Sequence, residues 1–139
     1  MKATILRVTS VLALLLAVTA VSAHAQTVLK AQKFTVPFDF KIGEKELPAG
    51  EYSVYAEDHA IRVQNTDGKG TAIALSKRYI NARRKGVEVK LRFRQYGNLY
   101  YLSQVWLADG LGRELPNSRS EYNDIAQTFN VVEVAARKR

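Results

Sequence analysis

The sequence contains no cysteine, and this absence removes several classes of chemistry. Thiol catalysis, thiolate zinc sites and iron–sulfur clusters all depend on cysteine side chains. Disulfide bonds are excluded for the same reason, so the folded chain must be held together by packing alone. A lipid-modified N-terminal cysteine is excluded as well.

Histidine is almost as scarce as cysteine. The chain has two histidines, and one of them, His24, lies in the N-terminal leader segment described below. The remaining residue, His59, cannot by itself build a histidine-rich metal site. No G-x-S-x-G turn is present that would make a serine the nucleophile of a catalytic triad. The sequence therefore predicts a protein that is not an enzyme and has no catalytic residue, metal or cofactor.

The acidic residues do not form a recognisable site either. Glu57 and Asp58 precede His59 between two expected strands, where a solvated turn explains them better than an oxygen-rich metal site. Glu44 and Glu46 form a second pair of carboxylates. A glycosidase needs two carboxyl groups about 5–10 Å apart across a cleft. A short chain with short loops leaves little room for such a cleft.

One glycine motif remains to be weighed. Gly110 and Gly112 precede Arg113 in a spacing that resembles a phosphate-binding nest. No G-K-S/T sequence follows, which makes the motif weak. A tight turn that carries a paired or solvated arginine is the expected structure, because glycine is used mainly for its backbone freedom.

The N-terminal segment has the layout of a secretory signal peptide. Lys2 and Arg7 supply the positive region, and residues 11–18 (VLALLLAV) form the apolar region. Ala23 and Ala25 are the small residues that a signal peptidase recognises. A spanning helix needs about 20 apolar residues, and this run is shorter. We therefore predict cleavage after Ala25, a secreted or periplasmic protein, and no transmembrane span after cleavage.

The cleaved segment defines the domain organisation. With residues 1–25 as the signal peptide, residues 26–139 have the length of a single domain. The formal net charge falls from +8 to +6, because Lys2 and Arg7 leave without any acidic residue. The mature chain keeps an excess of positive charge.

The mature chain alternates apolar and polar residues in short runs that turn residues separate. The expected strands span residues 34–42, 52–56, 60–64, 71–76, 87–94, 99–107 and 129–136. Residues 99–107 are apolar on both faces and should be central. Ser118 or Ser120 is expected to cap a short helix over Glu121–Gln127. The fold class is all-β or mainly β: an antiparallel sandwich or small barrel of about six or seven strands, with a cleaved signal helix and one short helix.

Three stretches carry a family resemblance: VPFDFKIGEKELPAGEYSV (36–54), LRFRQYGNLYYLSQVW (91–106) and GRELPNSRSEYN (112–123). Their V-P-F-x-F, L-P-A-G-x-Y, Y-G-x-x-Y-x-L-x-x-V-W and G-R-x-L-P-x-S motifs resemble a family of small secreted β proteins of soil bacteria such as the Acidobacteria. The resemblance covers most of the mature chain and implies secretion and a compact β fold. Its motifs identify no chemistry and carry over no catalytic residue. Tyr101 stands where members often have phenylalanine.

Basic residues gather in the middle of the chain. Between Lys77 and Asp109 the only acidic residue is Glu88, and residues 77–86 are expected to form a basic loop. The candidate patch for anionic partners comprises Lys77, Arg78, Arg83, Arg84, Lys85, Lys90, Arg92 and Arg94. Such an asymmetry creates a positive surface. A charged face that only keeps the protein soluble explains the pattern slightly better than a binding surface does.

The strand over residues 87–94 should have one buried and one cationic face. Its apolar residues are expected to share a core with Phe38, so that truncating Phe38 or Phe93 to alanine costs about 3–5 kcal/mol. Aromatic and cationic side chains then point to opposite faces, whereas an RNA-recognition sheet needs both on one exposed face. No specific nucleic-acid partner is expected.

Two function classes remain open. The first is an exported, non-catalytic structural or binding domain at the cell envelope, whose basic residues contact lipid headgroups, lipopolysaccharide or acidic glycan. The alternative is a carrier that holds a small apolar ligand or a glycan in a barrel interior. A carrier needs an internal cavity of about 300 Å³ or more, whereas a binding platform needs a filled core and an exposed patch.

Overall fold

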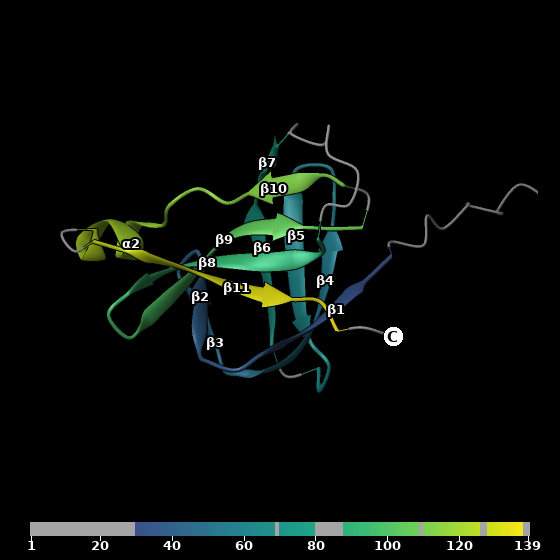
Figure 1. Cartoon of the computed structure of the whole chain (residues 1–139), viewed down its shortest axis with the longest axis horizontal. Coiled ribbons are helices and arrows are strands. Elements are labelled where there is room, and N and C mark those ends of the chain that lie inside the picture. Colours follow the sequence, from purple (N-terminus) through teal and green to yellow (C-terminus); the bar gives the residue numbers. More distant parts are fainter. Residues whose placement is uncertain (1–29, 69, 80–87, 109, 126–127, 138–139) are drawn as a thin grey trace, which may run out of the picture.

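The strands form two sheets that pack face to face, as the computed structural model in Figure 1 shows. The structure describes residues 30–68, 70–79, 88–108, 110–125 and 128–137, without the side chains of residues 78 and 79. The sheets are not closed into a barrel, so the predicted β fold is confirmed and takes the form of a sandwich. The predicted signal peptide lies outside the described residues.

The first sheet has four antiparallel strands in the order β1-β4-β5-β6. Their bounds are β1 (Gln32–Val36), β4 (Gly50–Ala56), β5 (Ala60–Asn65) and β6 (Thr71–Leu75). The predicted turn between β5 and β6 is present. Gly68 adopts a φ of 72°, and Asn65 Oδ1 accepts a hydrogen bond from the Asp67 backbone N–H at 2.7 Å. Asn-x-Asp-Gly chemistry thus sets this turn, because glycine tolerates positive φ without strain.

The second sheet has seven strands, five of them in the order β11-β8-β9-β10-β7. Their bounds are β7 (Lys77–Tyr79), β8 (Lys90–Tyr96), β9 (Leu99–Trp106), β10 (Gly112–Glu114) and β11 (Asn130–Ala135). The remaining two are β2 (Phe40–Ile42) and β3 (Lys45–Leu47), which pair with each other, and β2 also runs parallel to β9. The expectation that residues 99–107 form a central strand is confirmed.

The prediction of one strand over residues 34–42 is wrong, because these residues form two strands that belong to different sheets. β1 ends at Val36 and β2 begins at Phe40. Pro37 has no N–H to donate and interrupts the ladder, so the chain can pass from one sheet to the other. The carboxylate of Asp39 accepts a hydrogen bond from the Ala49 N–H at 2.8 Å and holds this corner.

Three short strands were not predicted. β3, β7 and β10 each have three residues and fall in segments that were expected to be turns or a basic loop. A run of three residues is too short to show a period of two. Tertiary pairing defines these strands instead: β10 lies between β9 and β7, and β3 pairs with β2.

The short helix α2 (Arg119–Asp124) is present and begins two residues before the expected start. Ser118 is its N-cap, and its Oγ accepts a hydrogen bond from the Glu121 N–H at 3.1 Å. This contact satisfies one of the N–H groups that a helix N-terminus leaves unpaired. Within the described ranges, no helix is long and apolar enough to cross a membrane.

The inner faces of both sheets supply the core. Phe93 is fully buried, and its ring meets the Phe40 ring edge-on at a centroid distance of 5.4 Å. Phe38 contacts Phe93 at 5.1 Å and stacks on Tyr100 at 3.9 Å. The expectation that Phe38 and Phe93 share one core is confirmed, although Phe38 lies at its margin and is half-buried.

Replacement of Phe93 by alanine should lower the free energy of unfolding by about 3–5 kcal/mol, because a buried ring is lost and a cavity remains. Phe38→Ala should lower it by less, since that ring is half-buried. Denaturant melts measure both changes. Ile73→Ala is the control, because Ile73 is 64% exposed and should change stability by no more than about 0.5 kcal/mol. A loss under about 1 kcal/mol for Phe93→Ala would contradict this assignment of the core.

Candidate functional site

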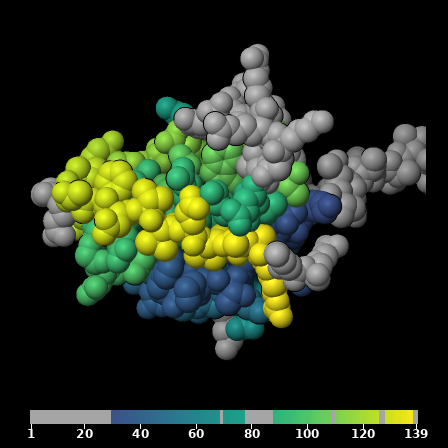
Figure 2. Space-filling model, viewed as in Figure 1, coloured from purple at the N-terminus to yellow at the C-terminus, as the bar shows by residue number. Residues whose placement is uncertain are grey.

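The candidate patch on β8 lies on the outer face of the second sheet. Lys90, Arg92 and Arg94 are partly buried on this face, and they alternate with Leu91 and Phe93, which are fully buried on the inner face. The two faces that the sequence predicted for this strand are therefore present. Figure 2 shows the C-terminal strand β11, in yellow, crossing this side of the molecule between β8 and the N-terminal strands.

β11 brings a carboxylate to two of these cations. Glu133 is the register partner of Arg92. Its Oε1 lies 2.8 Å from Arg92 Nε, and its Oε2 accepts a hydrogen bond from Lys90 Nζ at 3.0 Å. The Lys90 hydrogen bond, with the two positive charges, holds the pKa of Glu133 below its ordinary value. The Glu133 side chain is 39% exposed, and ion pairs of that kind contribute little to stability.

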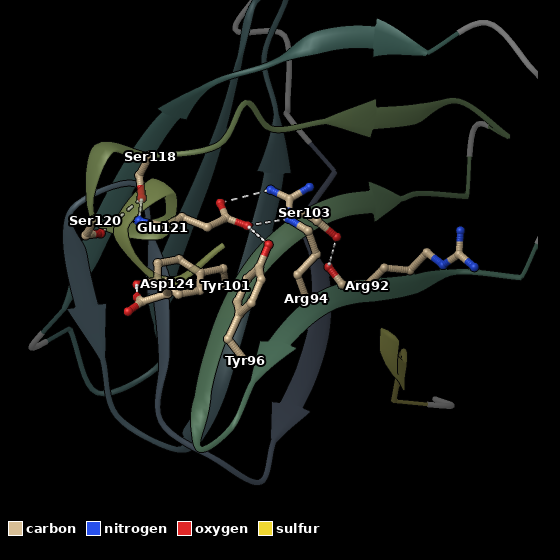
Figure 3. A network of polar contacts seen from close by, with 9 residues as sticks. All are labelled: Arg92, Arg94, Tyr96, Tyr101, Ser103, Ser118, Ser120, Glu121 and Asp124. Carbon is tan, nitrogen blue, oxygen red and sulfur yellow. Dashed lines mark hydrogen bonds and ion pairs between the residues drawn. The ribbon is translucent and has the colours of Figure 1, made fainter. Parts of the chain in front are cut away.

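Arg94 has a different environment, because α2 covers it (Figure 3). Its Nε and Nη2 donate to the two carboxylate oxygens of Glu121 at 2.5 and 3.1 Å. Glu121 is 1% exposed, and its Oε1 also accepts a hydrogen bond from the Tyr96 hydroxyl at 3.1 Å. This bidentate pair is shielded from water, so removing one partner would leave a buried charge.

A second tyrosine completes the contact between α2 and the sheet. The Tyr101 hydroxyl donates to Asp124 Oδ2 at 2.7 Å, and the Tyr96 and Tyr101 rings meet at 5.9 Å. Burial raises the pKa of both hydroxyls above the usual value for tyrosine, and the hydrogen bonds to Glu121 and Asp124 raise it further. Tyr101 is 1% exposed, so the hydroxyl that replaces a hydrogen of phenylalanine is buried and paired.

These contacts change the charge of the predicted patch. Three cations on β8 face the carboxylates of Glu121 and Glu133, which come from α2 and β11. The outer face of β8 is therefore close to neutral. Sequence reasoning missed both acids because they are 27 or more residues away from their partners. The only local signal was the Ser118 capping box, which marked the position of Glu121 but not its partner.

Of the other members of the candidate patch, Lys77 and Arg78 belong to β7. Lys77 is exposed on β7, which is the end strand in the order of the second sheet. The side chain of Arg78 and the whole of Arg83, Arg84 and Lys85 lie outside the described part of the chain. The structure thus separates Lys77 from the three paired cations of β8.

The turn that carries His59 has the predicted character. Residues 57–59 lie between β4 and β5, with Asp58 and His59 exposed. Glu57 Oε1 lies 3.2 Å from Arg62 Nε, so its carboxylate takes part in an ion pair. Over the ranges that the structure describes, no three histidine, aspartate or glutamate side chains gather as metal ligands would.

Comparisons with known proteins provide no relative for this chain. No protein-family model, no curated protein and no solved structure matches it. The resemblance to secreted β proteins of soil bacteria stays a prediction. The functional argument consequently rests on the chain's own geometry and charge.

Glu121→Gln should lower the free energy of unfolding by about 3–5 kcal/mol, because Arg94 would keep a buried charge without its carboxylate partner. Glu133→Gln is the matched control at an exposed ion pair and should cost about 0–1 kcal/mol. Urea denaturation at pH 7 measures both. The double variant R94M/E121L, in which no buried charge remains, should recover most of the loss. Equal losses in the two glutamine variants would contradict the assignment.

The buried tyrosines predict a loss of stability at alkaline pH. A pKa that is raised in the folded state means that tyrosine ionises more readily in the unfolded chain, so stability falls as pH rises above about 10. Tyr101→Phe should cost about 0.5–1.5 kcal/mol at pH 7, through loss of the Asp124 hydrogen bond, and should reduce the alkaline fall.

Denaturant melts from about pH 7 to pH 11 test this expectation. Tyr122→Phe is the control for the loss at neutral pH, because Tyr122 is 66% exposed and should change stability by less than about 0.5 kcal/mol. An alkaline fall in Tyr101→Phe as steep as in the wild type would show that ionisation of this hydroxyl does not contribute.

Proposed function

We propose that the protein is an exported, non-catalytic binding domain that acts at the cell envelope and contacts anionic surfaces. The candidate partners are lipid headgroups, the phosphates of lipopolysaccharide and acidic glycans. The formal net charge of +8, which becomes +6 on the expected signal cleavage, supports an electrostatic partner of negative sign. No cofactor is part of this proposal.

The distribution of charge after ion pairing carries the proposal. The cations of β8 are largely balanced by Glu121 and Glu133. Their charges therefore stabilise contacts within the fold and are less available to an anionic partner. Lys77 is exposed at the end strand of the sheet and directly precedes the remaining basic residues of the candidate patch. We therefore assign the anionic contact to the segment that contains Lys77, Arg78, Arg83, Arg84 and Lys85, which we call the basic segment.

The interior supports a surface contact better than a carrier. The space between the sheets is occupied by large buried side chains, among them Phe34, Tyr52 and Phe93. The sheets are not closed into a barrel that would surround a ligand. A carrier would need an apolar cavity of about 300 Å³ or more in this region. We therefore rank the carrier second.

The mature protein should bind vesicles that contain anionic phospholipid at low salt, with affinity falling about tenfold or more between 50 and 200 mM salt if several phosphates are contacted. Vesicle co-sedimentation measures this. The variant R83E/R84E/K85E should bind at least about tenfold more weakly, because each reversal removes an attraction and adds a repulsion.

A matched control separates the basic segment from net charge. The variant K30E/K33E/R119E makes the same change in net charge at three exposed positions outside the segment. Its binding should fall by less than about threefold. If both variants bind equally weakly, the loss of binding comes from the change in net charge and the assignment to the basic segment is wrong. Absence of binding by the wild type at low salt would overturn the proposal.

A further inference from the structure

Arg113 on β10 is buried, and two of its guanidinium nitrogens have no hydrogen-bond partner among the described residues. Only 6% of its surface is exposed, and its Nε and Nη1 are shielded from solvent and donate no hydrogen bond. The buried Nε atoms of Arg62 and Arg92 lie within ion-pair distance of Glu57 and Glu133. For Arg113, no carboxylate of the described ranges lies that close. The expected turn is present, since Gly110 has a φ of 74° and its N–H donates to Leu107 O at 3.0 Å. The expectation of a paired or solvated arginine is wrong for Nε and Nη1.

The register places Arg113 on the inner side of the second sheet. Its partner on β9 is Val105, which is fully buried in the core, and directly opposed residues of a ladder share a face. The partner on β7 is Arg78, a second cation. Ser76, two positions before Arg78, has a buried Oγ that also lacks a hydrogen-bond partner. Buried donors without a partner are thus present on β10 and directly before β7.

An uncompensated cation in this position is unfavourable. Guanidinium groups carry a permanent positive charge in proteins. A buried ion without a partner loses its hydration and gains nothing in return. An anion at this position would supply the missing hydrogen-bond acceptor and a compensating charge.

We propose that Arg113 is the centre of a binding site for a compact oxyanion, which is a phosphate or a carboxylate group. Arginine binds both groups through charge-assisted hydrogen bonds, and apolar surroundings strengthen such bonds. The site does not rest on the proposed surface contact, because its central cation is buried and lies outside the basic segment.

Thermal unfolding of the mature protein in sodium phosphate, with sodium chloride of equal ionic strength as reference, tests the site. At about ten times the dissociation constant, phosphate should raise the wild-type Tm by about 5 °C. Arg113→Met should show no rise, and in chloride it should be at least as stable as the wild type, because an apolar group replaces an unpaired charge.

Arg137→Gln is the matched control. It removes one positive charge from an exposed side chain that pairs with Glu51, and it should keep the full response to phosphate. A parallel series in sodium acetate shows whether the site prefers a phosphate or a carboxylate group. A response to phosphate alone assigns a phosphate group, and a response to acetate alone assigns a carboxylate. No rise in the wild type with either anion, or an equal rise in Arg113→Met, would overturn the proposal.

Nuclear magnetic resonance of the wild type keeps the test decisive if Arg113→Met does not fold. The Nε–H resonance of Arg113 is assigned as the arginine signal that is missing from the spectrum of Arg113→Lys. Titration with the anion that raises Tm should shift this resonance and leave that of Arg137 unchanged. An unchanged Arg113 resonance at saturating anion would refute the site.

Discussion

The carboxylate of Glu121 joins α2 to the second sheet, and much of this side of the molecule depends on that contact. It accepts two hydrogen bonds from Arg94 and one from Tyr96, while the Glu121 N–H donates to the Ser118 cap. Glu121 thus connects the N-terminus of the helix to the surface of the sheet. Because the pair is removed from water, it stabilises the fold only as long as both partners are present. The buried tyrosines beneath α2 depend on the same arrangement.

Ion pairing also decides which basic residues are available to a partner. Arg94 resembles a binding residue in the sequence, yet in the structure its charge is paired with the carboxylate of Glu121. Arg113 shows the opposite case, since the sequence indicated an ordinary turn residue, whereas the structure buries its side chain with no carboxylate of the described residues in ion-pair distance. The difference lies in the acids that the tertiary structure brings close. Clusters of basic residues along a sequence therefore overstate a positive surface when acids from distant strands fold over it.

The architecture follows from a packing constraint on two half-apolar sheets. Each sheet has one apolar face. In the sandwich the apolar faces of the two sheets pack against each other through side chains such as Tyr52 and Phe93. Pro37 makes this possible at the N-terminal end, because the chain leaves the first sheet there and enters the second. The strands β3 and β10 then extend the second sheet through pairing with strands already in place. These strands are too short to show an alternation of apolar and polar residues, so pairing with neighbouring strands determines their conformation.

The sequence by itself determined the β class, most long strands, the central place of residues 99–107, the Ser118-capped helix and the two faces of β8. These features depend on local alternation, turn chemistry and capping, which act over a few residues. Only the tertiary structure decided that the sheets form an open sandwich, that residues 34–42 divide between sheets, and that Glu121 and Glu133 neutralise the β8 cations. Those outcomes arise from contacts between residues far apart in the chain, whose Coulomb and packing energies depend on distances that no local pattern records.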